Sequence, residues 1–106
     1  MMYVIHFDEP GHWSIMAWAH ADRGSYQKTL GICERLFSQH QDPPEVALLA
    51  AARAWAASDN REKAFSCLNQ ALDRGWAYAP DLENAEFDGL RDAPAWKTIL
   101  ERIQVI

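Results

Sequence analysis

Residues 85–103 read AEFDGLRDAPAWKTILERI, and they carry the clearest structural signal in the chain. The first half is acidic and rich in turn-forming residues, whereas the second half has apolar residues at helical spacing. Asp92 is a suitable N-cap for a helix from about Ala93 to Gln104. Four residues would share one side of that helix: Trp96, Ile99, Leu100 and Ile103. The pattern predicts a terminal helix that covers another helical surface.

Two helices are predicted at the start of the chain. Pro10 suits the first turn of a helix over 10–22, because proline lacks only an N–H that would have no partner there. The sequence RGS at 23–25 separates this helix from a second one over 26–39. Gly31 lies inside the second helix at a cost of about 1 kcal/mol relative to alanine. We therefore expect Gly31 to permit a close contact with a neighbouring helix.

Two further helices are predicted before the acidic stretch. Asp42 is the expected N-cap of an alanine-rich helix over 45–58. Asp59 is expected to cap the next helix, which should end at Gly75. Residues 1–9 contain the β-branched and aromatic run YVIHF and are predicted to form a short extended arm.

The chain of 106 residues is long enough for one domain with one core, but not for two. We expect a single domain over 1–106 with four parts: an N-terminal arm at 1–9, a first helical hairpin at 10–41, a second at 42–75, and an acidic loop with a capping helix at 76–106.

An internal repeat relates the two hairpins at an offset of 35 residues. Large residues align with large residues and small ones with small ones. The aligned pairs are Trp13 with Leu48, Met16 with Ala51, Ala17 with Ala52, His20 with Trp55, Gly24 with Asp59, Thr29 with Ala64, Cys33 with Leu68, and Leu36 with Ala71.

These hairpins resemble the tetratricopeptide repeat family, whose signature is W-x2-L-G-x2-Y followed by A-x3-F. The first copy reads Trp13-x2-Met16-Ala17-x2-His20 and then Thr29-x3-Cys33, and the second reads Leu48-x2-Ala51-Ala52-x2-Trp55 and then Ala64-x3-Leu68. The first copy departs from the family at Thr29 and Cys33, and the closing proline is absent from both copies.

The end of the chain resembles the element that closes repeat arrays in bacterial tetratricopeptide proteins. The matching residues are Gly75, Leu82, Phe87, Leu90, Arg91, Asp92, Pro94, Trp96 and Leu100. The resemblance implies an all-α superhelix of two antiparallel hairpins and a C-terminal capping helix. A single hairpin cannot bury its apolar face alone. The last helix would cover the fourth helix, with Phe87 and Leu90 closing the side.

Composition restricts the partners. The formal charge is -5, which disfavours nucleic acid and anionic membrane surfaces, because both attract basic proteins. No segment approaches the roughly 20 apolar residues of a membrane span, and the N-terminus lacks the features of a signal peptide. The two cysteines, Cys33 and Cys67, are predicted to be buried and reduced, and a disulfide between them is the alternative. The expected location is the cytoplasm.

The sequence offers little catalytic chemistry. His6, Asp8, Glu9 and His12 lie close together, but their spacing fits no known metal motif. No nucleophile elbow, zinc motif or phosphate loop is present in the sequence. We therefore expect a non-enzymatic protein without a metal or cofactor.

The resemblance implies that a peptide or protein partner binds the concave face, which the first helix of each hairpin forms. The residues expected at that face are Ser14, Trp18, Asp22, Leu49 and Arg53. Trp and Arg are enriched among residues that dominate binding energy. In the alternative interpretation, Trp18 packs under the arm and Arg53 is only solvated.

The leading hypothesis is a protein–protein interaction module. A second hypothesis is a bacterial immunity or antitoxin-type protein that neutralises a basic toxin through the acidic segment 81–92. A third is a structural homodimer joined through the uncovered first hairpin, which concentration-dependent mass would identify.

Overall fold

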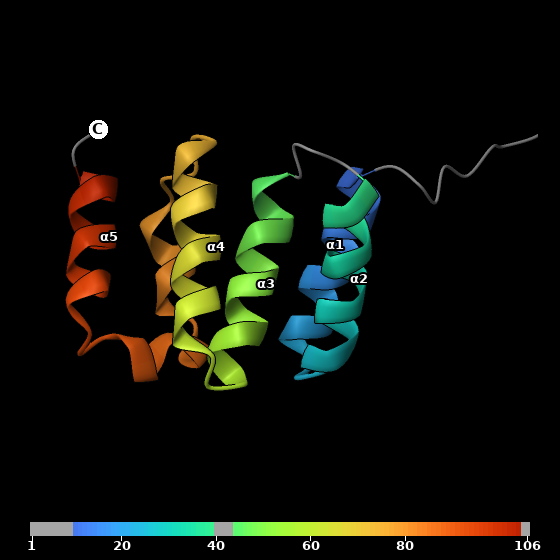
Figure 1. The fold of residues 1–106 in the computed structure, drawn as a ribbon, viewed down its shortest axis with the longest axis horizontal. Coiled ribbons are helices and arrows are strands. Elements are labelled where there is room, and N and C mark those ends of the chain that lie inside the picture. Colours follow the sequence, from blue (N-terminus) through green and yellow to red (C-terminus); the bar gives the residue numbers. More distant parts are fainter. Residues whose placement is uncertain (1–9, 40–43, 105–106) are drawn as a thin grey trace, which may run out of the picture.

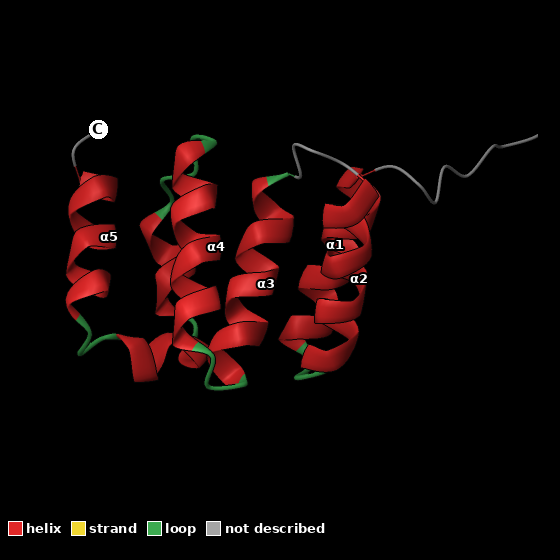
Figure 2. Cartoon of the chain, in the orientation of Figure 1, coloured by secondary structure: helices red, strands yellow, loops and turns green. Residues whose placement is uncertain are grey.

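The computed structural model describes residues 10–39 and 44–104, and every regular element in these residues is helical (Figure 2). This confirms the all-α class. Five α-helices and two short 3-10 helices follow one another in this order: α1 (Pro10–Asp22), α2 (Tyr26–Gln39), α3 (Glu45–Ala57), α4 (Arg61–Asp73), η1 (Ala79–Glu83), η2 (Ala85–Leu90) and α5 (Pro94–Gln104). The predicted arm at 1–9 lies outside the described residues.

The helices stand side by side in a row (Figure 1). Helices α1 and α2 form one hairpin, and α3 and α4 form the next. Both helices of the first hairpin pack on α3, η2 packs on the same helix, and α5 packs on α4. The molecule measures 53 × 29 × 23 Å.

The internal repeat appears in the backbone with the predicted offset. Helices α1 and α3 begin 35 residues apart, as do α2 and α4. The aligned turn residues Gly24 and Asp59 both adopt the left-handed conformation, with φ of 77° and 61°. Equivalent backbone hydrogen bonds close both turns, from the Ser25 N–H to the His20 carbonyl (2.8 Å) and from the Asn60 N–H to the Trp55 carbonyl (2.9 Å).

The expected N-caps were less accurate than the helices themselves. Asp59 does not cap α4, because its left-handed backbone ends the preceding turn, as Gly24 does. Asn60 is the cap, and its Oδ1 accepts a hydrogen bond from the Lys63 N–H at 3.2 Å. Asp42 lies outside the described residues, and Pro44 holds the N-cap position of α3.

Small residues along α3 allow its neighbours to approach closely. The buried residues run without interruption from Ala47 to Ala54. The two positions that depart from the repeat signature also find partners at this junction. The Thr29 hydroxyl donates to the Ala17 carbonyl at 2.9 Å, and the Cys33 Sγ donates to the Ala47 carbonyl at 3.4 Å. A polar Thr is tolerated in the core because its hydroxyl is hydrogen-bonded.

The expected role of Gly31 is wrong. Gly31 is exposed, and a Cβ atom built there would meet no atom within 4 Å. No neighbouring helix requires a glycine at this position. The residue weakens α2 without serving a close contact.

The predicted C-terminal helix is present and packs on α4. Helix α5 begins at Pro94, one residue later than expected, and its Trp96, Ile99 and Ile103 are buried. The rings of Phe87 and Trp96 lie 5.9 Å apart in a tilted arrangement, which is within the favourable range for aromatic pairs. Arg102 anchors the edge of α5 to α4 through Asp73, at 2.7 Å. In the described part of the chain, no helix is sufficiently long and apolar to cross a lipid bilayer.

Candidate peptide-binding groove

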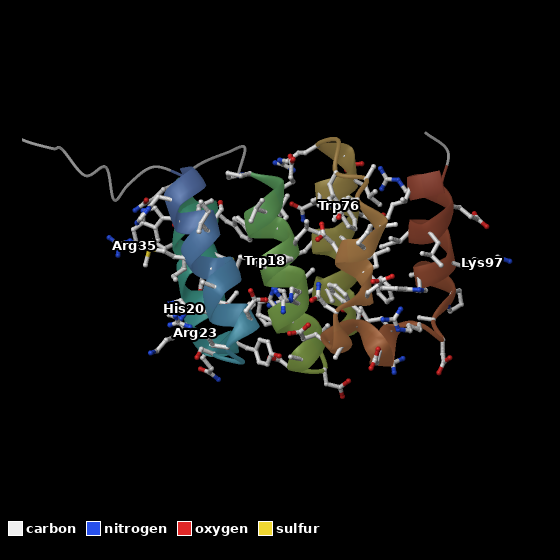
Figure 3. The ribbon with its side chains drawn as sticks, turned by 180° about the vertical axis from the view of Figure 1, so that it is seen from behind. Trp18, His20, Arg23, Arg35, Trp76 and Lys97 are labelled. Carbon is white, nitrogen blue, oxygen red and sulfur yellow. The ribbon has the colours of Figure 1, made fainter. Side chains whose placement is uncertain are left out.

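A groove of about 310 Å³ lies between the first helices of the two hairpins and η1. It is lined by Ile15, Trp18, Val46, Leu49 and Asp81. Ile15 is 68% exposed and Val46 is 39% exposed, although both are large aliphatic residues. Figure 3 shows Trp18 between α1 and α3. The groove is thus an apolar surface open to solvent, with a single carboxylate at its rim.

Helical spacing explains how these side chains converge. Ile15 and Trp18 are three residues apart on α1, and Val46 and Leu49 have the same separation on α3, so each pair shares a helix face. Asp81 comes from η1, and its Oδ2 accepts a hydrogen bond from Trp76 Nε1 at 3.0 Å. This bond fixes the carboxylate at the groove edge.

Beside the groove, Arg53 organises a partly buried polar network. Its Nε and Nη2 donate to the two carboxylate oxygens of Glu86 at 3.2 and 3.0 Å, and its Nη1 donates to Asp22 Oδ1 at 2.8 Å. The Tyr26 hydroxyl donates to Glu86 Oε2 at 2.8 Å. The guanidinium also lies over the Trp18 ring, 4.5 Å from its centroid. The network therefore joins α1, α2, α3 and η2.

The network keeps its charges paired. Burial would lower the pKa of Arg53, but the hydrogen bonds and charges of Glu86 and Asp22 outweigh burial and raise that pKa. Burial raises the pKa of Tyr26, and the hydrogen bond to Glu86 raises it further. Tyr26 therefore remains a hydrogen-bond donor, and Arg53 remains a cation.

The five residues predicted at the concave face have different environments. Trp18 and Leu49 line the groove. Arg53 and Asp22 form an ion pair beside it, in which the Asp22 side chain is 57% exposed. Ser14 is buried in the core. The interpretation of Arg53 as merely solvated is wrong, because only 4% of its surface is exposed.

Sequence reasoning missed two kinds of residue at this site. Ile15 and Val46 were overlooked, although each precedes a predicted groove residue by three positions, so the helical period could have identified them. Asp81 and Glu86 reach the site only through the path of the chain after Gly75. The one signal in the sequence for Glu86 was the position of Arg53 in an alanine-rich helix. A cation buried in such a helix requires an anionic partner, which Glu86 supplies.

Several acidic side chains of segment 81–92 make contacts within the molecule. Glu86 pairs with Arg53, Asp88 pairs with Arg91 at 3.1 Å, and Asp81 accepts from Trp76. Exposed acidic side chains that remain in the segment include Glu83 and Asp92.

Within residues 10–39 and 44–104, no group of three or more His, Cys, Asp or Glu side chains is arranged to hold a metal ion. His6, Asp8 and Glu9 lie outside these residues. Comparisons with known protein families, curated proteins and solved structures found no match to this chain.

Proposed function

We propose that this protein is a non-catalytic interaction module, built as a short tetratricopeptide-like stack in the cytoplasm, that binds a peptide segment of a partner protein. The groove between α1 and α3 carries the proposal. Monomeric proteins seldom leave large aliphatic side chains together in an open concavity without a binding role. Ile15 and Val46 are arranged in this way.

The lining indicates the chemistry of the ligand. Ile15, Trp18, Val46 and Leu49 favour an aliphatic or aromatic anchor side chain. Asp81 favours a Lys or Arg close to that anchor, because a carboxylate can accept further hydrogen bonds in addition to the one from Trp76. We therefore expect a peptide that combines an apolar residue with a basic one.

The acidic-surface alternative has less support. In segment 81–92, the Glu86 side chain is only 10% exposed and pairs with Arg53, whereas Asp88 pairs with Arg91 at the surface. The charge of Glu86 is therefore directed to Arg53 and not to a partner, and that of Asp88 is partly offset by Arg91. The groove offers a shaped apolar concavity, which is the kind of site that dominates binding energy.

The test is selection from a library of random peptides of about nine residues. Extended, such peptides span roughly 30 Å, which matches the 29 Å width of the molecule. Selected peptides should combine an apolar anchor with a basic residue. The variant Ile15→Gln/Val46→Gln should bind them about tenfold or more weakly. Met16→Gln is the matched control, since Met16 is a partly exposed apolar residue of α1 that does not line the groove.

Equal binding by the wild type and the double variant would refute the proposal. Exposed residues are chosen for replacement so that the variants keep their fold, which far-ultraviolet circular dichroism would verify.

A further inference from the structure

The end of the row formed by α1 and α2 carries a second hollow, of about 330 Å³. Its lining, here named the open-end surface, consists of Trp13, His20, Lys28, Gly31, Ile32 and Arg35. Figure 3 shows His20 and Arg35 at this end, opposite Lys97 on α5. The buried residues of the same hairpin, including Ala17 and Cys33, belong to the core shared with α3. Among the described residues, the open-end surface is therefore the side of the first hairpin without a covering helix.

This surface is cationic in a chain whose formal charge is -5. Lys28, Ile32 and Arg35 follow one another at i, i+4 and i+7 and form one stripe along α2. The Arg35 guanidinium lies over the Trp13 ring, 5.2 Å from its centroid.

The acidic residues of this hairpin lie elsewhere. Asp22 pairs with Arg53 of α3, and Glu34 lines a different hollow together with Phe37 and Lys63. Neither of these carboxylates belongs to the lining of the open-end surface.

The opposite end of the row shows how a hairpin of this stack is covered. Helix α5 buries Trp96, Ile99 and Ile103, and Arg102 pairs with Asp73 at the edge of the contact. The covering element is an amphipathic helix with an ion pair at its rim. At the open end the hairpin itself supplies cations, so a covering helix of matching chemistry would supply carboxylates.

We infer that the open-end surface docks an acidic amphipathic helix from a partner protein. An apolar side chain of that helix fills the hollow beside Trp13 and Ile32. Two carboxylates face Lys28 and Arg35, which are seven residues apart, or about 10.5 Å along a helix axis. A glutamate pair at i and i+7 of the partner matches this spacing. A second copy of the chain is a poorer occupant, because twofold packing would oppose the two cationic stripes.

The probe is a synthetic helical peptide of about 14 residues, or four turns, with a leucine stripe flanked by glutamates at i and i+7. Its matched control carries lysine at the glutamate positions. Calorimetric titration of the full chain should show binding of the acidic peptide and weaker binding of the lysine peptide. Lys28→Glu and Arg35→Glu should each weaken binding of the acidic peptide about threefold to tenfold.

Lys97→Glu makes the same charge change at the far end of the molecule and should leave the affinity unchanged. If Lys97→Glu weakened binding of the acidic peptide as much, the effect would depend on net charge alone, and the inference would be overturned. No binding by the wild type would also overturn it. A rise in affinity on Asp8→Lys/Glu9→Lys would identify the chain's own N-terminal segment as the occupant. If the protein formed a dimer that the peptide dissociates, a second copy of the chain would be the occupant of the surface.

Discussion

Arg53 shows how a single charged residue can order several elements of the stack. It lies in an alanine-rich helix with 4% of its surface exposed, where an unpaired cation would be very costly. Glu86 meets it with both carboxylate oxygens and is itself held by Tyr26. The polar network therefore fixes the path of η2 across α3, beside the groove.

The two carboxylates that contact Arg53 should differ in their effect on stability. Glu86→Ala leaves a buried guanidinium without its main partner and should lower the free energy of unfolding by about 3–5 kcal/mol. Asp22→Ala should cost about 1 kcal/mol or less, because the Asp22 side chain is 57% exposed and water screens the pair. Urea denaturation measures both changes. Equal losses would contradict the assignment of Glu86 as the principal partner.

The buried thiols make a pH-dependent contribution to stability. Burial raises the pKa of Cys33 to about 12 and that of Cys67 to about 11, from an ordinary value of 9.0. A raised pKa in the folded state stabilises the fold fully below the unfolded pKa, and this contribution is lost as pH rises through the folded values. Stability should therefore fall between about pH 9 and 12 by up to about 1.4 kcal/mol per pKa unit for each thiol.

The variant Cys33→Ala/Cys67→Ala isolates this contribution. Its free energy of unfolding, measured from pH 8 to 11, should decline less steeply than that of the wild type, whatever its value at pH 8. Parallel curves for the two proteins would show that the thiols do not titrate differently on folding.

At the scale of elements, hydrophobic periodicity and helix-breaking residues were sufficient to predict the helices. Capping preferences were not sufficient to predict which residue caps each helix. Helices α1 and α2 have the predicted bounds because Pro10 and the turn at 23–25 determine them by local chemistry. The N-cap of α4 is Asn60 and not the predicted Asp59, because Asp59 takes the left-handed turn position. A sequence does not show which of two adjacent Asx residues takes which role.

Gly31 gives a direct test of helix α2. It is exposed within the helix, and a methyl group there meets no atom within 4 Å. Gly31→Ala should raise the free energy of unfolding by about 0.5–1 kcal/mol, because alanine loses less backbone entropy on folding. Thermal or urea denaturation measures the change. A loss of stability would show that a close neighbour occupies the space beside Gly31.

The capping helix should be essential for the stack. Trp96 is buried against Phe87, and Arg91 lies over its ring, 5.3 Å from the centroid. Trp96→Ala should destabilise the fold by about 3–5 kcal/mol. The exposed neighbour Lys97 provides the control, since Lys97→Ala should change stability by about 0.5 kcal/mol or less. A small effect of Trp96→Ala in urea denaturation would contradict the role of α5 as a cap.

At the scale of the whole molecule, the stack has two open hollows: the apolar groove of Ile15, Trp18, Val46 and Leu49, and the cationic open-end surface. The sequence could predict helix faces, and hence Trp18 and Leu49. It could not show that the chain after α4 returns across α3, which brings Asp81 to the groove and Glu86 to Arg53. That return depends on packing between segments about 30 residues apart in the sequence, as in the Arg53–Glu86 pair.

The groove is tested most directly by nuclear magnetic resonance of the ¹⁵N-labelled full chain, titrated with the tightest peptide from the library selection. Binding in the groove should produce its largest amide and indole shift changes at Ile15, Trp18, Val46 and Leu49. The Ile15→Gln/Val46→Gln variant should lose these changes, and Met16→Gln should keep them. Shift changes centred on residues 81–92 or on the open-end surface, with the groove signals unmoved, would contradict the proposed binding site.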